Sequence, residues 1–265
     1  MLEEESAVGC YLAAPSLKLK TGQRKGMVIL IEDLQKSRGY KPDTFFLAVN
    51  IADNFLSKRA RENRPAPCLL TLAVTSVIIA AKIEEQNMPR ILNMTDLLYE
   101  KHGVAISEET ILSFEFTILS YLDFRLRYTS PVHFLERYQR IFGLDKEATD
   151  KTSRDVGNMA RKFIRFMIIN KGFLKYKPSA MAAASLLLGI KVTLSSGITK
   201  LTNEQRQRLI ADNKIQDPDR LWQDSNEVVA TGLDYGADIK QVYSRLVNKL
   251  SNTNSDITLE GEEQA

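Results

Sequence analysis

The chain has 265 residues, 44% hydrophobic and 26% charged, which is enough for one or two domains with a substantial core. Its formal net charge of +3 argues against the strong basic excess that is typical of nucleic-acid-binding domains. The acidic start MLEEES, the widely separated Cys10 and Cys68, and the absence of a membrane-length apolar run predict a reduced protein without signal peptide or membrane span. We therefore expect it in the nucleus, the cytoplasm or both.

Residues 1–20 show no clear hydrophobic period and are predicted to form an N-terminal tail. From Met27 to Leu34 the apolar residues recur at helical spacing, and Gly39 and Pro42 end that predicted helix. Pro42 also begins a second amphipathic stretch, which a polar connector follows. These signals predict two helices before residue 60.

The stretch 68–81 is almost entirely apolar or small, and it is too long for a strand and too short for a membrane span. It therefore predicts a helix that is buried on all sides, and this helix ends abruptly in Lys82, Glu84 and Glu85. Two further helices are expected, a short one stopped by Gly103 and another that begins after Ser107.

The second half of the chain repeats this plan. Residues 179–191 are again mostly small and apolar, follow a proline and end in a lysine, as residues 68–82 do. The repeat predicts an all-α fold of two tandem five-helix bundles, residues 21–127 and 128–250, with an acidic disordered tail at 251–265.

Signatures of catalysis are missing from the sequence. The two histidines, His102 and His133, and the two cysteines are not clustered as zinc ligands would be, and there is no phosphate-binding glycine loop or GxSxG motif. We expect no catalytic residue, metal or cofactor, and the sequence favours a binding function.

Four stretches resemble those of one protein family. TFFLAVNIADNFL (44–56), IIAAKIEE (78–85), ILSFEFTILSYLDFRL (111–126) and FLKYKPSAMAAASLLL (173–188) are similar to cyclin signatures, in character closest to the A and B types. The resemblance covers residues 21–245 and implies a regulatory subunit that binds and activates a cyclin-dependent protein kinase by positioning its regulatory helix and activation loop.

The resemblance also implies which residues contact the kinase. Lys82 and Glu115 are the positions that hydrogen-bond backbone groups flanking the kinase's regulatory helix, and we expect both side chains to face solvent in the free protein. The adjoining surface comprises Ile79, Ile83, Glu84, Leu119, Phe124 and Leu126. The residues by themselves leave alternatives open: Lys82 as a helix C-cap, Glu115 as a solvated side chain, and Arg90 as compensation for the acidic end of the helix.

The cyclin groove that docks Arg-x-Leu segments of substrates or inhibitors is expected to be degenerate here. The corresponding positions are Gln23, Arg24, Met27, Leu30, Asp33 and Leu70. Leu30 replaces the usual tryptophan and Leu70 a glutamine, so we expect poor peptide binding, with Arg24 and Asp33 left as surface charges that attract a peptide.

A different function would be nucleic-acid binding, as in the cyclin-like core of a general transcription factor. The basic run KRARENR at 58–64 is its support. We expect instead a solvated connector, because the charge is nearly balanced and no zinc-ribbon cysteines are present.

Overall fold

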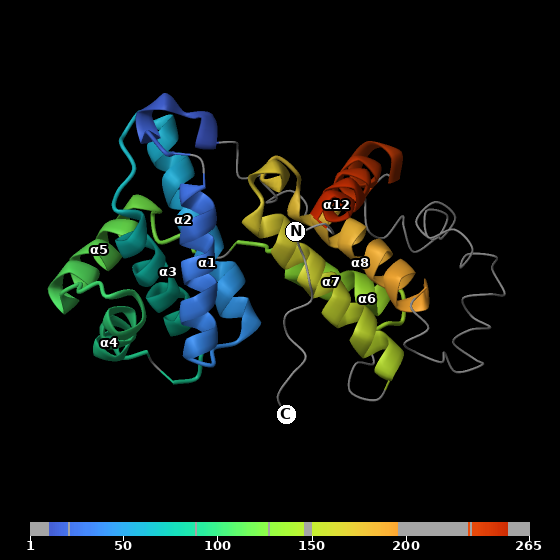
Figure 1. Cartoon of the computed structure of the whole chain (residues 1–265), viewed down its shortest axis with the longest axis horizontal. Helices are drawn as coiled ribbons and strands as arrows, with labels where there is room; N and C mark the ends of the chain where they lie inside the picture. Colours follow the sequence, from blue (N-terminus) through green and yellow to red (C-terminus); the bar gives the residue numbers. More distant parts are fainter. Residues whose placement is uncertain are drawn as a thin grey trace. The chain divides into compact units, whose positions relative to one another are not determined.

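The structure is a computed structural model that describes residues 11–20, 22–87, 89–126, 128–145, 150–195, 233 and 235–253. Every regular element in these ranges is helical, which confirms the all-α prediction (Figure 1). Within the described residues, the chain divides into two compact units. The first unit takes in 11–132 and 168–175, and the second takes in 133–167 and 176–253.

The first unit is built around one buried helix. Its α-helices are α1 (Gln23–Ser37), α2 (Pro42–Arg61), α3 (Leu69–Glu84), α4 (Ile91–His102) and α5 (Glu108–Tyr121). Every residue of α3 from Leu72 to Ala81 is buried, and α3 packs against α1, α2 and α5. The prediction of a central helix without an exposed face is therefore confirmed.

Local sequence signals explain where several of these helices begin and end. Pro42 occupies the first turn of α2, where its missing N–H costs nothing. The hydroxyl of Ser107 accepts a hydrogen bond from the Thr110 N–H and caps α5. Gly103 ends α4 with a φ of 66°, a left-handed conformation that glycine adopts without strain.

The predicted tail of residues 1–20 is corrected for residues 11–17, whereas residues 1–10 lie outside the described residues. Two 3-10 turns, η1 (Tyr11–Ala13) and η2 (Pro15–Leu17), pack against α2. Tyr11 and Leu17 are only 4% and 3% exposed, so this segment belongs to the core of the first unit. Two buried side chains in so short a stretch do not produce a recognisable hydrophobic period, so the sequence pattern did not predict this packing.

The second unit contains α6 (Pro131–Ile141), α7 (Lys151–Ile169), α8 (Pro178–Ser195), the π-helical turn η4 (Tyr235–Ile239) and α12 (Lys240–Thr253). The first two residues of α6 and the last two residues of α7 belong to the first unit. Residues 179–190 of α8 are all buried, which confirms the predicted second central helix. Gly189 allows close packing on α7, since a Cβ there would lie 3.1 Å from the Val156 carbonyl oxygen.

Some predictions concern residues at the end of the second unit. The stretch NEQRQRLIADN (203–213) also has a helical pattern and predicts a further helix. This stretch and residues 254–265 of the expected tail lie outside the described residues. Residues 251–253 continue α12 as helix. None of the described helices combines the length and hydropathy that crossing a bilayer requires.

Candidate functional site

Lys82 and Glu115 form an ion pair between α3 and α5. The Lys82 Nζ lies 2.6 Å from Glu115 Oε1 and 2.8 Å from Oε2. The Glu115 side chain is only 11% exposed and that of Lys82 is 30% exposed. The expectation that both side chains face solvent is therefore wrong for Glu115, whose carboxylate is buried by the packing of α5 on α3, whereas Lys82 is exposed as expected.

The acidic end of α3 forms hydrogen bonds with the start of α2. Glu85 Oε1 accepts a hydrogen bond from the Lys41 N–H at 2.7 Å and another from the Thr44 hydroxyl. Glu85 thereby caps the N-terminus of α2, where a negative charge is favourable. The Lys41 Nζ donates to the Glu84 carbonyl oxygen at 3.0 Å, so Lys41 and Thr44, rather than Arg90, compensate the end of α3.

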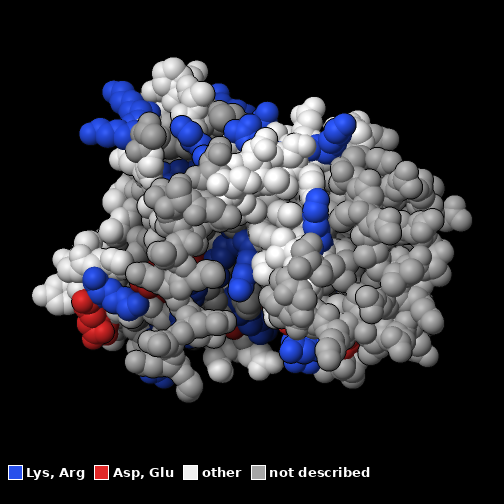
Figure 2. All heavy atoms as spheres, turned by 45° about the vertical axis from the view of Figure 1, so that its right-hand side comes forward, with Lys and Arg blue, Asp and Glu red and all other residues white. Residues whose placement is uncertain are grey.

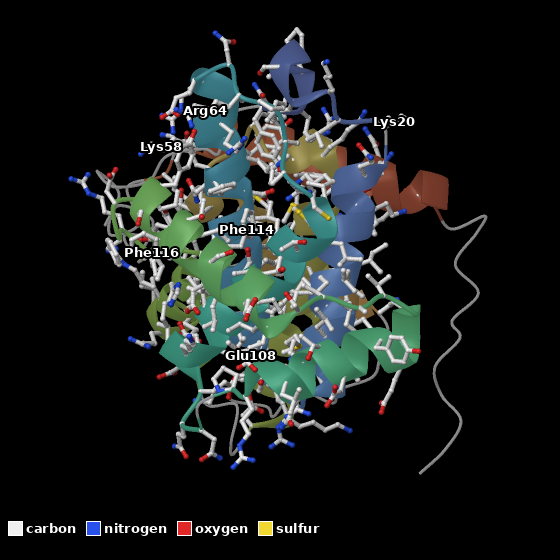
Figure 3. All side chains as sticks on the ribbon, turned by 90° about the vertical axis from the view of Figure 1, so that its left-hand side faces the viewer. Lys20, Lys58, Arg64, Glu108, Phe114 and Phe116 are labelled. Carbon is white, nitrogen blue, oxygen red and sulfur yellow. The ribbon has the colours of Figure 1, made fainter. Side chains whose placement is uncertain are left out.

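An apolar surface lies beside the ion pair, on α5 and at the end of α3. Its most exposed members are Ile83 (48%), Leu112 (47%), Phe116 (68%) and Phe124 (64%), and we call these four residues the apolar face. Leu119 and Leu126 are partly exposed. Figure 3 shows Phe116 projecting from α5.

Two details of the apolar face differ from the prediction. Ile79 is only 2% exposed and belongs to the core, because α3 is covered on all sides. The helical spacing of residues 111–121 predicts Leu112 and Phe116 as core positions, and this prediction is wrong. Both are exposed, because they lie one helical turn apart and offset from Ile111, Glu115 and Ile118, the buried residues of α5.

The backbone holds Phe124 in an unfavourable conformation. Asp123 and Phe124 have φ values of 54° and 55°, a left-handed region that non-glycine residues seldom occupy. The Phe124 N–H donates to the Leu119 carbonyl at 2.9 Å and fixes the turn. Local strain that displays an exposed aromatic side chain is a feature of binding sites rather than of cores.

The basic run at 58–64 begins as the last turn of α2, where the prediction of a solvated connector is wrong, and continues as an exposed turn at 62–64. The Lys58 Nζ donates to the Tyr121 carbonyl at 2.5 Å and pairs with Asp123 at 3.1 Å. Burial, followed by the hydrogen bond to Glu62, raises the pKa of Tyr121 to about 12. Figure 3 shows Lys58 and Arg64 near one end of α5.

In the view of Figure 2, the Lys and Arg side chains of the described residues lie in several separate groups. Arg59 and Arg64 of the basic run are engaged locally, Arg59 with the Pro65 carbonyl at 2.7 Å and Arg64 with Glu62 at 3.4 Å. These observations do not favour nucleic-acid binding.

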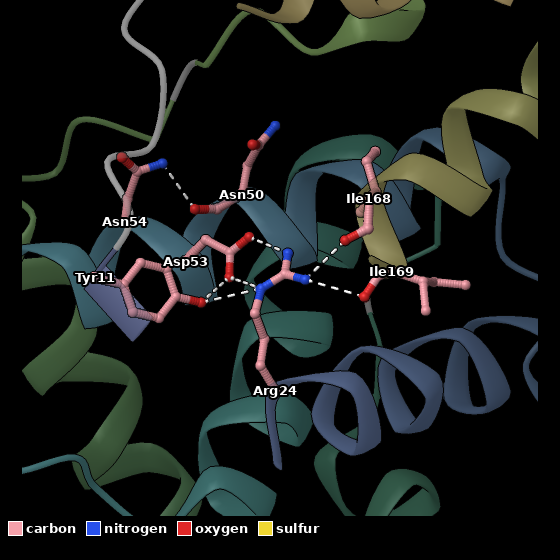
Figure 4. Close-up of polar contacts among 7 residues, drawn as sticks. All are labelled: Tyr11, Arg24, Asn50, Asp53, Asn54, Ile168 and Ile169. Carbon is pink, nitrogen blue, oxygen red and sulfur yellow. Dashed lines mark hydrogen bonds and ion pairs between the residues drawn. The ribbon is translucent and has the colours of Figure 1, made fainter. Parts of the chain in front are cut away.

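Arg24 is a buried structural residue and not a surface charge. It is 3% exposed, and its Nη2 and Nε lie 2.6 Å and 2.9 Å from the two carboxylate oxygens of Asp53 (Figure 4). Its Nη1 donates to the Ile168 carbonyl at 2.8 Å, and the Tyr11 hydroxyl donates to Asp53. Burial, reinforced by the Asp53 charge, raises the pKa of Tyr11 well above its usual value.

The other positions of the expected docking groove are also partly engaged. Asp33 pairs with Lys101 at 3.2 Å and lies 3.3 Å from His102 Nε2, and Met27 is buried. Gln23 accepts a hydrogen bond from the Lys20 N–H at 2.7 Å, while Leu30 and Leu70 are partly exposed. Arg24 and Asp33 are thus not the free charges that we expected, whereas poor peptide docking stays a prediction.

Among the described residues, no three His, Cys, Asp or Glu side chains lie close enough to hold a metal ion. What the α3–α5 surface offers is a charged pair with spare hydrogen-bonding capacity beside an exposed apolar face.

Comparison with known proteins identifies the family. Residues 3–127 match the N-terminal domain of cyclins, and residues 129–217 match the C-terminal domain. Cyclin-D2-1 of rice is 32% identical over 172 residues, which are 65% of this chain and 50% of that protein. The G2/mitotic-specific cyclin-B of Dictyostelium discoideum is 29% identical over 155 residues, 58% of this chain and 32% of that protein.

Solved structures show the same fold. A viral cyclin from herpesvirus saimiri superposes with a TM-score of 0.56 at 15% identity, covering 83% of this chain and 96% of that one. The yeast RNA polymerase II CTD kinase CTDK-1 complex contains a chain with a TM-score of 0.50 at 14% identity, covering 92% of this chain and 78% of that one. The chain spans half or less of the length of the curated relatives named above. With both cyclin domains matched in order and a fold of two helical bundles, this chain belongs to the cyclin family.

Proposed function

We propose that this chain is a regulatory subunit that binds a cyclin-dependent protein kinase through α3 and α5 and activates it. The observation that carries the proposal is the Lys82–Glu115 pair beside the apolar face. Membership of the cyclin family supports it, as does the fold shared with a chain in the CTDK-1 kinase complex.

The apolar face suits an amphipathic helix of the kinase. Aromatic and aliphatic side chains exposed together lose contact with water when such a helix covers them, and this supplies most of the affinity. Phe116 and Phe124 are the largest of them and are expected to dominate the binding energy.

The ion pair sets the orientation of that helix. The Lys82 ammonium has three N–H groups, of which the two Glu115 contacts use at most two, so one remains for a backbone carbonyl of the partner. The Glu115 carboxylate likewise has lone pairs free for a backbone N–H. Because the two side chains already hold each other in place, they lose little conformational entropy when the partner binds.

Activation then follows from differential binding. If the chain binds the kinase better when its regulatory helix is in the active position, it shifts the population toward that state. All the phosphoryl-transfer chemistry belongs to the kinase.

Affinity capture with purified variants tests the proposal. The wild-type chain is expected to retain a protein kinase and to raise its activity, while Phe116→Ala is expected to lose both effects. Tyr99→Ala on α4 is the matched control, because Tyr99 is 63% exposed and lies outside the apolar face. Capture of no kinase, or equal capture by Phe116→Ala, would contradict the proposal.

A further inference from the structure

A polar cavity of about 490 Å³ lies in the first unit, and none of the residues that line it belongs to the apolar face. The turn between α1 and α2 forms one side of it, and the segment between α3 and α4 forms the other. These segments are about 50 residues apart in sequence and meet at the lower end of the unit in Figure 1. The volume is within the range of sites that bind small ligands or single side chains.

Positive charge dominates the lining of the cavity. Arg38 and Lys41 come from one side, and Arg90 from the other, with Glu85 as the acidic residue of the lining. The Glu85 carboxylate is already engaged by the Lys41 N–H and the Thr44 hydroxyl. Three cations and one carboxylate leave a formal excess of two positive charges.

The two arginines are available to a ligand. Neither Arg38 nor Arg90 has a hydrogen-bond or ion-pair partner for its guanidinium within the described part of the chain, and both residues are exposed. In contrast, Arg24 and Arg59 of the same unit are engaged by carboxylate or carbonyl oxygens. Two unpaired guanidinium groups around one cavity form an arrangement suited to an anion with several oxygens.

Neighbouring polar groups strengthen this preference. Arg90 is the N-cap of α4, and no side chain caps the first turn of that 12-residue helix. Its free N–H groups add to the positive potential near Asn93, which lines the cavity. Asn87 and Asn93 also offer side-chain amides that can bind a peptide backbone.

We propose that this cavity binds the phosphate of a phosphorylated serine or threonine in a segment of a partner protein. A phosphate monoester carries nearly two negative charges and three acceptor oxygens, which match the charge excess and the two guanidinium forks. Glu85 lies three residues after Lys82, so the cavity adjoins the surface on which a protein partner is proposed. The choice of a protein-borne phosphate over a free one rests on the proposed function.

Fluorescence anisotropy at low salt tests this proposal on the full chain. The probes are a labelled five-residue peptide with phosphoserine between glycines, its unphosphorylated twin, and inorganic phosphate as competitor. We expect binding of the phosphopeptide only, and competition by inorganic phosphate only at much higher concentration. The double variant Arg38→Gln, Arg90→Gln should lose about tenfold or more in affinity, because charge-assisted hydrogen bonds are the strong ones.

Controls separate this site from general charge effects and from the fold. Arg61→Gln removes an exposed arginine at the end of α2 and should leave the affinity unchanged. The single variants Arg38→Gln and Arg90→Gln should each lose part of the affinity, and they replace the double variant if its circular dichroism shows unfolding.

Three results would overturn the proposal: equal affinity for both peptides, unchanged affinity in the arginine variants, or competition by inorganic phosphate as tight as binding of the phosphopeptide. None of them affects kinase capture through Phe116. Failure of this proposal and failure of the proposed function are therefore distinguishable.

Discussion

Two ion pairs in the first unit join a cation to a carboxylate, but their surroundings differ. The Arg24 and Asp53 side chains are 3% and 4% exposed, and Arg24 also donates to a backbone carbonyl oxygen. The Lys82 and Glu115 side chains are 30% and 11% exposed, and they lie beside the apolar face. The first pair has its hydrogen bonds satisfied within the unit, whereas the second keeps capacity for a partner. Exposure and spare hydrogen-bonding capacity, rather than residue type, distinguish the structural pair from the pair that we propose to bind a partner.

Breaking the buried pair should have the largest effect. Arg24→Met leaves the Asp53 carboxylate buried without a cation, and we expect the free energy of unfolding to fall by about 3–5 kcal/mol. Urea denaturation followed by circular dichroism measures it. A loss below about 1 kcal/mol would show that the buried pair contributes little, contrary to the comparison.

Breaking the binding pair should cost less stability. Lys82→Ala leaves Glu115 largely buried and unpaired, and we expect a loss of about 1–3 kcal/mol in the same denaturation experiment. The variant should also weaken kinase binding, because the donor that orients the partner is missing. A loss as large as that of Arg24→Met would contradict the distinction between the two pairs.

The buried network around Arg24 should also respond to alkaline pH. The pKa of Tyr11 in the folded chain is raised by burial and by Asp53, so its protonated form stabilises the fold. This stabilisation is complete below pH ~10, the pKa of tyrosine in the unfolded chain. Above that pH, the free energy of unfolding falls by up to about 1.4 kcal/mol per pH unit, because the unfolded chain loses the proton first. Tyr11→Phe should therefore lose less stability than the wild type above pH ~10. If exposed Tyr99→Phe had the same effect, the shift would not belong to Tyr11.

Removing Phe124 should leave stability almost unchanged. Phe124→Gly relieves a left-handed φ but gives the unfolded chain more freedom, and we expect a net change within about 0.5 kcal/mol. Kinase binding should nevertheless be lost, because the aromatic ring belongs to the apolar face. A folded variant that still bound the kinase normally would remove Phe124 from the site.

Much of the fold was predictable because it depends on local patterns. The apolar stretch that ends in Ala81 has no polar face, so it predicted the buried α3, and Ser107 predicted the start of α5. The repeat that ends in Lys191 predicted α8. The first two signals each lie within about twenty residues, and the repeat compares two stretches of that length. None of them requires knowledge of which elements pack together in space.

The site was less predictable because it depends on contacts between distant segments. The burial of Glu115 depends on how α5 packs against α3, and that of Arg24 on Asp53, 29 residues away. The apolar pattern of residues 68–81 predicted a buried Ile79, and only the family resemblance placed this residue on the kinase-binding surface. The cavity combines Arg38 with Arg90, and no sequence motif links the two positions.

Site-specific photocrosslinking tests the central claim most directly. A photoreactive phenylalanine analogue at Phe116, incubated with the captured kinase and irradiated, should crosslink to a helical segment of the kinase. The same analogue at Tyr99 on α4 should give little or no crosslink, because that side chain lies outside the apolar face. A kinase that stays bound but crosslinks only from Tyr99, or from neither position, would contradict binding through α3 and α5.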